Sequence, residues 1–336
     1  MISENLLPFV TPIEIYMMLR GFIPVVIIVI VGIIIGKWDA SKHQLTLIKL
    51  TNYIFLPCLA FSALHKHAFD CTEIIAIALG VLIIISATTI VSVFVLGEKF
   101  RGGSKNILAA VYMSSGTLMP PLAFVLFGNE GLAKAIYFHL FVIIYYNTLG
   151  LWMVEGTGNL KAILKTPLVY LVILGVAARI FPFSLPDTVE EFAWLAEKGV
   201  DLTAMGALPL LLISFGYPLG LLKISDFKGG VKGGLLRVVV SPLVALLVVY
   251  IYRKTGLLNM DRGYDILGFL DQRTTEALLI LGAALPTSNY ALHMHIDNDE
   301  VKAEKRITGT LLVSVVASVV TIPVVLLLIL MFIFTD

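Results

Sequence analysis

Charged residues are what this sequence has least of. Asp, Glu, Lys and Arg make up 14% of its 336 residues, whereas hydrophobic residues make up 58%. Soluble domains carry about 25% charged residues, so this composition excludes an ordinary soluble fold. The formal net charge is +1, which offers no basis for binding nucleic acid. The sequence therefore predicts an all-α polytopic membrane protein whose surroundings are the lipid bilayer.

Cysteines and catalytic motifs are also scarce. The two cysteines, Cys58 and Cys71, do not have the spacing of metal or redox ligands, and they make no disulfide framework. The sequence contains no metalloprotease, nucleophile-elbow or phosphate-loop pattern. We therefore expect neither an enzyme nor a bound metal nor a cofactor.

Long apolar stretches dominate the chain instead. A helix needs about 20 apolar residues to cross the hydrocarbon core of a bilayer. The sequence predicts ten such spans, at residues 15–36, 44–64, 73–96, 106–127, 132–153, 167–183, 199–222, 231–252, 275–296 and 304–333. A further stretch, residues 187–198, is predicted to form a short interfacial helix.

Lysine and arginine alternate in abundance along the connections between these spans. The connections after the odd-numbered spans hold more of them than the other connections do. Basic residues collect on the cytoplasmic side of a membrane. We therefore expect a multi-pass protein of the cell membrane with both termini extracytoplasmic, which agrees with an even number of spans.

The two halves of the chain, residues 1–153 and 154–336, look like copies of one five-span unit. The second span reads NYIFLPCLAFSALHK and the seventh reads MGALPLLLISFGYPL. The fourth ends PPLAFVLFGNEGLAKA and the ninth ends LPTSNYALHMHIDNDEVKAEK. Because five is odd, the two copies would lie in opposite orientations across the membrane, as in many secondary transporters.

Proline interrupts one span in each half, in Met113–Gly128 and in Leu281–Ile296. Proline removes a backbone donor and usually breaks a helix. Broken backbone at membrane depth is tolerated where it is buried in protein or lines a cavity. Paired breaks in corresponding halves therefore predict the position of a binding site, and Pro121 and Pro286 would shape it.

Small polar residues gather at these two breaks. A free helix N-terminus attracts an anion such as a carboxylate, and nearby hydroxyls and amides add donors. The alternative role of small hydroxyls is to cap a kink or to ease helix packing. The candidates for binding an anion are Ser114, Ser115, Thr117, Thr287, Ser288 and Asn289.

Several ionisable residues near the breaks have more than one interpretation. His293 and His295 are two residues apart, so they point to different helix faces and predict no shared metal. One of them, or His139, could titrate in a proton relay. Arg237 could snorkel, pair with a carboxylate or assist an anionic ligand. Asp70 and Glu73 would be either a proton-linked acid or part of a hydrated loop.

Four stretches of the sequence resemble the auxin efflux carrier (PIN-like) family of the bile acid/auxin carrier superfamily. They are Phe22–Leu64, with its N…LP…F pattern, and Ser114–Phe138, Phe141–Met153 and Leu281–Glu304. The resemblance implies a sodium/proton antiporter-type fold of ten helices, built as two inverted five-helix repeats with broken crossover helices. In that fold spans 1, 2, 6 and 7 form a scaffold and spans 3–5 and 8–10 form a mobile core. The resemblance also implies a homodimer through the scaffold.

The same resemblance assigns further residues to the binding site. Gly116 matches the family's crossover glycine, and Tyr146 and Asn147 match a polar pair that faces the crossover. Asn52 would contribute to the scaffold wall. The sequence departs from the family pattern at Ser114, where an asparagine is usual, and at its double proline, Pro120-Pro121.

The sequence thus predicts a secondary active or facilitative transporter of small organic anions, auxin-like carboxylates or dicarboxylates, working by an elevator mechanism. Coupling to sodium or to a proton stays open. A cation/proton antiporter would need carboxylates deep in the broken spans, and the sequence offers none there. The alternatives are a sodium-coupled organic anion symporter of the bile acid type and a transporter-like ligand sensor.

Overall fold

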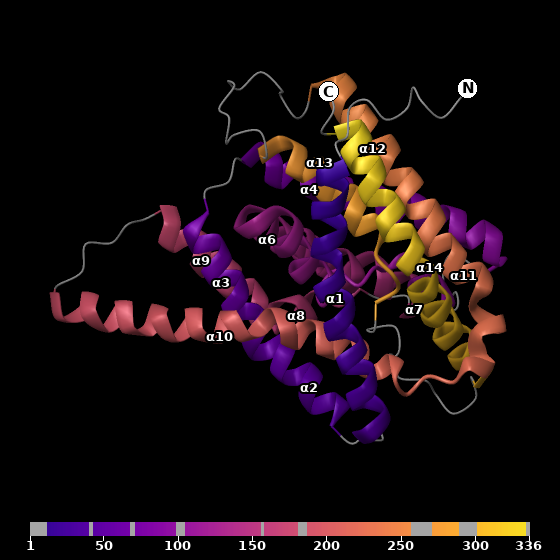
Figure 1. Ribbon diagram of the computed structural model, residues 1–336, viewed down its shortest axis with the longest axis horizontal. Helices are drawn as coiled ribbons and strands as arrows, with labels where there is room; N and C mark the ends of the chain where they lie inside the picture. Colours follow the sequence, from indigo (N-terminus) through magenta and orange to yellow (C-terminus); the bar gives the residue numbers. More distant parts are fainter. Residues whose placement is uncertain are drawn as a thin grey trace.

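The fold is a bundle of helices (Figure 1). The computed structural model describes residues 12–39, 43–67, 71–98, 105–155, 158–180, 187–256, 271–288 and 301–333. Within these ranges, seven helices are long and apolar enough to cross a membrane. This confirms the prediction of an all-α polytopic membrane protein, whereas ten spans and an inverted repeat stay predictions.

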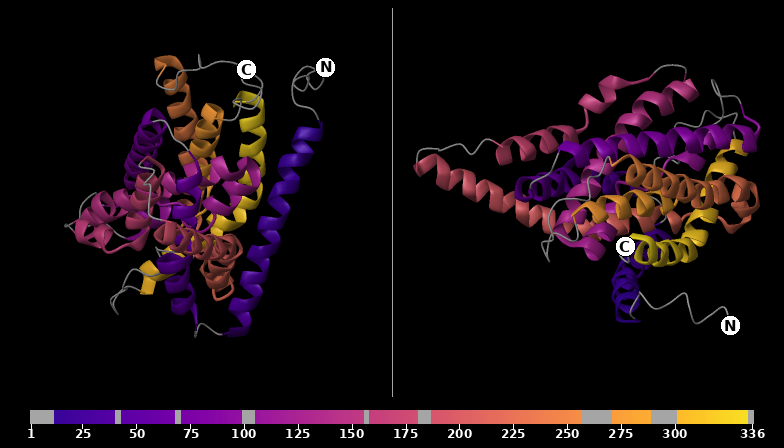
Figure 2. Two further views of the ribbon diagram at one scale, coloured as in Figure 1. Left: turned by 90° about the vertical axis from the view of Figure 1, so that its left-hand side faces the viewer. Right: turned by 90° about the horizontal axis from the view of Figure 1, so that it is seen from above.

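The first, third and tenth predicted spans are single helices, namely α1 (Pro12–Asp39), α4 (Cys71–Leu96) and α14 (Val301–Ile333). The start of α1 and the end of α14 lie at the same end of the molecule (Figure 2). The sixth predicted span is the shorter helix α9 (Pro167–Ile180). Short helices α7 (Leu151–Glu155) and α8 (Leu160–Leu164) connect the two halves.

Two spans contain a π-helical turn that a proline follows, while a third such turn, Tyr146–Gly150 in the fifth span, has no proline after it. The second span runs through α2 (Gln44–Leu50), the turn Thr51–Phe55 and α3 (Leu56–Lys66). The eighth runs through α11 (Val231–Leu235), the turn Leu236–Val240 and α12 (Ser241–Thr255). A proline follows each turn, Pro57 in the first case and Pro242 in the second. Because proline lacks an N–H and crowds the preceding turn, the backbone widens there.

Residues 187–198 do not form a separate interfacial helix, so that prediction is wrong. They are the first part of α10 (Asp187–Leu219), a continuous helix of 33 residues that extends beyond α3 and α9 (Figure 1). At 1.5 Å per residue it is about 50 Å long. Where residues 187–198 join the rest of α10, the sequence has only Gly199 to disfavour a helix. A glycine inside a helix costs about 1 kcal/mol without breaking it.

The helices pack in two groups. The first packing group consists of α1, α2, α3, α9 and α10, in which α1 lies along α10 and α3 lies between α9 and α10. The second packing group consists of α4, α5 (Lys105–Val111), α6 (Met119–Tyr145), α11, α12, α13 (Asp271–Ala284) and α14. Helix α6 contacts α1, α3 and α10, and thereby joins the groups.

Glycines bring α1 and α10 into backbone contact. A Cβ atom built on Gly36 would lie 2.1 Å from the carbonyl oxygen of Tyr217, and one on Gly216 would lie 2.2 Å from that of Val29. Gly32 and Gly36 are four residues apart in α1. Such small-residue spacing lets two membrane helices approach closely, and the association then depends on van der Waals contact.

Candidate functional site

An interrupted helix meets the carboxyl end of a second helix in the interior of the second packing group. Helix α5 ends at Val111 and α6 begins at Met119, while α13 ends at Ala284. Met113 and Thr287, which lie between or beyond these helices, pair as an isolated antiparallel bridge. We call this meeting point, formed by residues 112–118 and 285–288, the crossover.

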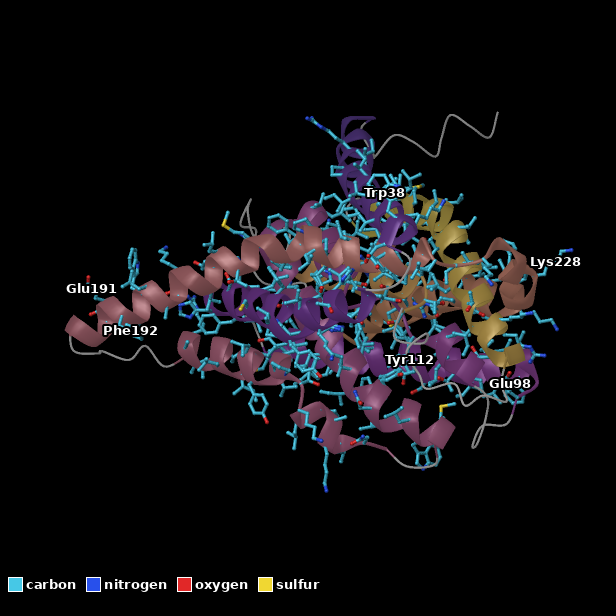
Figure 3. The ribbon with its side chains drawn as sticks, turned by 90° about the horizontal axis from the view of Figure 1, so that it is seen from below. Trp38, Glu98, Tyr112, Glu191, Phe192 and Lys228 are labelled. Carbon is cyan, nitrogen blue, oxygen red and sulfur yellow. The ribbon has the colours of Figure 1, made fainter. Side chains whose placement is uncertain are left out.

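Two backbone hydrogen bonds hold the crossover together. The N–H of Ser114 donates to the carbonyl of Pro286, and the N–H of Ser288 donates to the carbonyl of Tyr112, both at 2.9 Å. Tyr112 is 4% exposed and lies within the bundle (Figure 3). Extended backbone inside a membrane protein needs such partners because neither lipid nor the broken helices supply them.

Arg237 binds the carbonyl ends of α5 and α13. Its guanidinium donates to the carbonyls of Val111 (2.8 Å), Ala283 (2.6 Å) and Leu285 (3.0 Å). A fourth bond, of 2.8 Å, goes to the hydroxyl of Ser241 one turn along the same span. The last carbonyls of a helix have no intrahelical donor, so this side chain satisfies groups that the breaks leave open. Arg237 is fully buried, so it does not snorkel, and its described partners are carbonyls and a hydroxyl rather than a carboxylate. Assistance to an anionic ligand stays a prediction.

The hydroxyls at the crossover bond within the protein. Ser114 and Thr117 share a hydrogen bond of 2.7 Å between their hydroxyl oxygens. Thr287 donates its hydroxyl to the carbonyl of Ala109 at 2.8 Å, near the end of α5. Its N–H donates to the hydroxyl of Ser314 in α14 at 3.0 Å. Thr287 therefore caps a helix end, whereas the partly exposed Thr117 is better placed to meet a ligand.

Ser115 and Gly116 line a buried imidazole. The hydroxyl oxygen of Ser115 lies 2.9 Å from Nδ1 of His139, and both side chains are 2% exposed. A Cβ atom on Gly116 would lie 2.5 Å from Cε1 of the same ring. Only glycine therefore lets the crossover backbone lie flat against His139.

The double proline changes how the amino end of α6 can bind an anion. Pro120 and Pro121 are buried in the first turn of α6. Neither has an N–H, and the N–H of Leu122 already donates to the carbonyl of Leu118 at 3.2 Å. Fewer backbone donors remain than at an ordinary helix N-terminus, so an anion bound there would depend more on hydroxyls and on the helix dipole.

The residues assigned from the family resemblance lie in different places. The ring of Tyr146 packs edge-on against that of Tyr112, with centroids 5.0 Å apart. Asn147 donates its side-chain amide to the carbonyl of Ile143 at 2.9 Å. Asn52 is half-buried in a π-helical turn of the first packing group. Asn289, His293 and His295 lie outside the described residues.

Buried ion pairs are the feature that sequence reasoning missed. Nζ of Lys134 lies 3.3 Å from Oε1 of Glu73 and 2.9 Å from that of Glu130. Arg253 forms an ion pair of 2.7 Å with Glu276. Glu73 is 5% exposed, so it does not belong to a hydrated loop. The four-residue spacing of Glu130 and Lys134 was the available signal, because such pairs meet on one helix face.

Metal binding finds no support in the described ranges, because no three His, Cys, Asp or Glu side chains come together there.

Figure 3 places Glu191 and Phe192 at the far end of α10, away from Tyr112. The crossover is therefore the candidate site that the described residues form.

Comparison with known proteins points to transport. No family model matches the chain. It is 26% identical to a protein of Methanothermobacter thermautotrophicus over 309 residues, which cover 86% of this chain and 89% of the relative. It is 26% identical to a protein of Methanocaldococcus jannaschii over 255 residues, covering 69% of this chain and 80% of that one. Both relatives are named as uncharacterized transporters. Together with the membrane architecture, these likenesses support a transporter rather than an enzyme.

Proposed function

We propose that this chain is a secondary transporter, active or facilitative, of small organic anions with a carboxylate group. The observation that carries the proposal is the crossover, where the break between α5 and α6 meets the residues that follow α13 inside the bundle. Discontinuous helices near the membrane midplane are how many secondary transporters form their substrate sites. The binding residues would be Ser114, Thr117 and the neighbouring residues at the two breaks, including Asn289.

The proposed architecture is two inverted repeats of five spans. In support, the run Met119–Met153 turns at Gly128, whose φ of 66° lies outside the helical range, so it can count as two crossings. The first half also holds an interrupted helix, and its break meets the residues that follow α13 in the second half. The resemblance to auxin efflux carriers, the homodimer and the cell-membrane location with extracytoplasmic termini belong to the same proposal.

An elevator mechanism fits the packing. The first packing group matches the scaffold of spans 1, 2, 6 and 7, and the second contains α5, α6 and α13, which form the crossover. In an elevator the second group would carry the substrate past the first. In such an elevator the binding site would move as one unit, because the residues that form the crossover all belong to the second packing group.

Binding and flux need separate tests. A thermal-shift screen of monocarboxylates and dicarboxylates on the purified chain should reveal stabilising compounds, because a ligand that binds the folded state raises stability by mass action. The compounds found are then measured for flux in proteoliposomes with the voltage clamped by potassium and valinomycin. The absence of both stabilisation and flux across the screen would refute the proposed function.

The flux measurement also separates the remaining alternatives. Uniport predicts voltage-driven net flux without a sodium or pH gradient. A sodium-coupled symporter predicts flux that requires sodium; the paired hydroxyl oxygens of Ser114 and Thr117 are ligands of the kind that such an ion takes. Stabilisation by a carboxylate with no flux under any gradient would indicate a ligand sensor.

A further inference from the structure

The hydrogen bonds of Arg237 do not by themselves explain why a charged side chain is buried at this position. The side chain is 0% exposed, in the π-helical turn between α11 and α12. Its described partners are three carbonyls and one hydroxyl, all uncharged. Neutral donors could satisfy those carbonyls too, whereas burying a guanidinium is costly. The charge itself must therefore contribute something that a neutral side chain could not.

The helix ends around Arg237 carry partial charges with which its positive charge interacts. A helix carries roughly half a negative elementary charge at its carboxyl end and half a positive one at its amino end. Two carboxyl ends, those of α5 and α13, lie at the crossover beside the amino end of α6. The two carboxyl ends contribute negative potential, which repels an anion unless a positive charge offsets it.

We propose that Arg237 sets the charge preference of the crossover. Its positive charge outweighs the two carboxyl ends and makes the potential positive, so the site accepts a singly charged carboxylate. Arg237 does this without touching the substrate, since its bonds go to the backbone that forms the site. It is a positioning and specificity-determining residue. This inference rests on the proposed function and narrows its substrate class to monoanions.

The potential can be measured without a substrate. In a chain with Cys58→Ala and Cys71→Ala, the substitution Thr117→Cys places a thiol at a partly exposed position beside Ser114. The rates at which anionic sulfonatoethyl and cationic trimethylammonioethyl methanethiosulfonate modify this thiol are compared in the purified chain. Leu160→Cys, which is exposed on α8, corrects for the intrinsic reactivity of the two reagents.

The corrected ratio should favour the anionic reagent while Arg237 is charged. Arg237→Gln removes the charge, and Arg237→Lys keeps it. Ser241→Asp neutralises Arg237 in place, because the hydroxyl of Ser241 lies 2.8 Å from Nη1, and Ser241→Asn is its uncharged control. At an effective dielectric constant of about 20, we expect loss of the unit charge to lower the ratio about tenfold or more. Arg237→Lys and Ser241→Asn should stay near the unsubstituted ratio.

The inference is overturned if the background chain shows no anion preference, or if Ser241→Asp leaves the ratio where Ser241→Asn leaves it. Ser241→Asp keeps the guanidinium in place, so it decides the matter even where Arg237→Gln does not fold. A merely structural role for Arg237 would leave this charge-dependent ratio unchanged. If no carboxylate binds the chain, the proposed function fails, but the reagent ratio still reports on Arg237, so the two failures are distinguishable.

Discussion

Lys134 shows how single residues hold charge inside this chain. Its ammonium group is 0% exposed and lies between the carboxylates of Glu73 and Glu130. Burial of any one of these charges would be unfavourable without the others, because desolvation is then uncompensated. The cluster joins α4 to α6 within the second packing group.

Lys134→Met should therefore destabilise the protein strongly. It leaves Glu73 buried without its cation, and breaking a buried pair in this way costs about 3–5 kcal/mol. Thermal unfolding of the purified protein measures the effect. The double variant Lys134→Met/Glu73→Gln removes both charges and should recover much of the loss. Equal stability of the single and double variants would show that the pair contributes no charge compensation.

At the scale of elements, the prolines predict the breaks but not their position. In the first break the helix is already interrupted from Tyr112 to Leu118, and Pro120 and Pro121 then lie in the first turn of α6. Proline is favoured at the start of a helix because its missing N–H has no partner there anyway. These prolines mark where a helix begins again. The turn at Gly128, by contrast, falls between the predicted fourth and fifth spans.

The partners of the crossover residues could not be predicted from the sequence. Arg237 bonds to Val111 and Ala283, which belong to different helices far from it in the chain. Nothing in a local pattern specifies such pairs, whereas hydropathy specifies the helices that bring them together. The same limit explains why the interfacial helix predicted at residues 187–198 was wrong. The first part of α10 is polar enough to suggest a position at the membrane interface, although its backbone continues the helix.

The α1–α10 contact gives a prediction for one element pair. Gly36→Ala puts a methyl group 2.1 Å from the carbonyl oxygen of Tyr217, so the helices must separate. Overpacking of this kind costs about 1–3 kcal/mol. Gly199→Ala is the matched control in α10, since nothing lies within 4 Å of its added methyl group, and it should stabilise by up to about 1 kcal/mol. Thermal unfolding compares the two; similar shifts for both variants would contradict the close contact.

At the scale of the whole molecule, topology is the prediction to test. Helix α9 has 14 residues, about 21 Å, which is shorter than a hydrocarbon core of about 30 Å. If it crosses, then Leu160→Cys before it and Glu191→Cys after it lie on opposite faces of the membrane. In cells, with Cys58 and Cys71 replaced by alanine, an impermeant maleimide should label Glu191→Cys directly. It should label Leu160→Cys only after permeabilisation.

Two other outcomes carry different meanings. The reverse pattern would overturn the predicted orientation and keep α9 as a span. Labelling of both positions from one face would show that α9 does not cross, and the count of ten spans would then be wrong.

The polar contacts within each packing group have a mechanical consequence. Asp201 binds Lys66 within the first packing group, and the crossover bonds and the Lys134 cluster lie within the second. Between the groups, α6 meets α1 at contacts such as that of Gly21 with the side chain of Val125. Apolar contact has no preferred direction, so one surface can shift along the other while the same area stays out of lipid. The resistance to sliding between the two packing groups should thus be low. The rate at which one group moves against the other should depend more on the lipid around the bundle than on bonds within it.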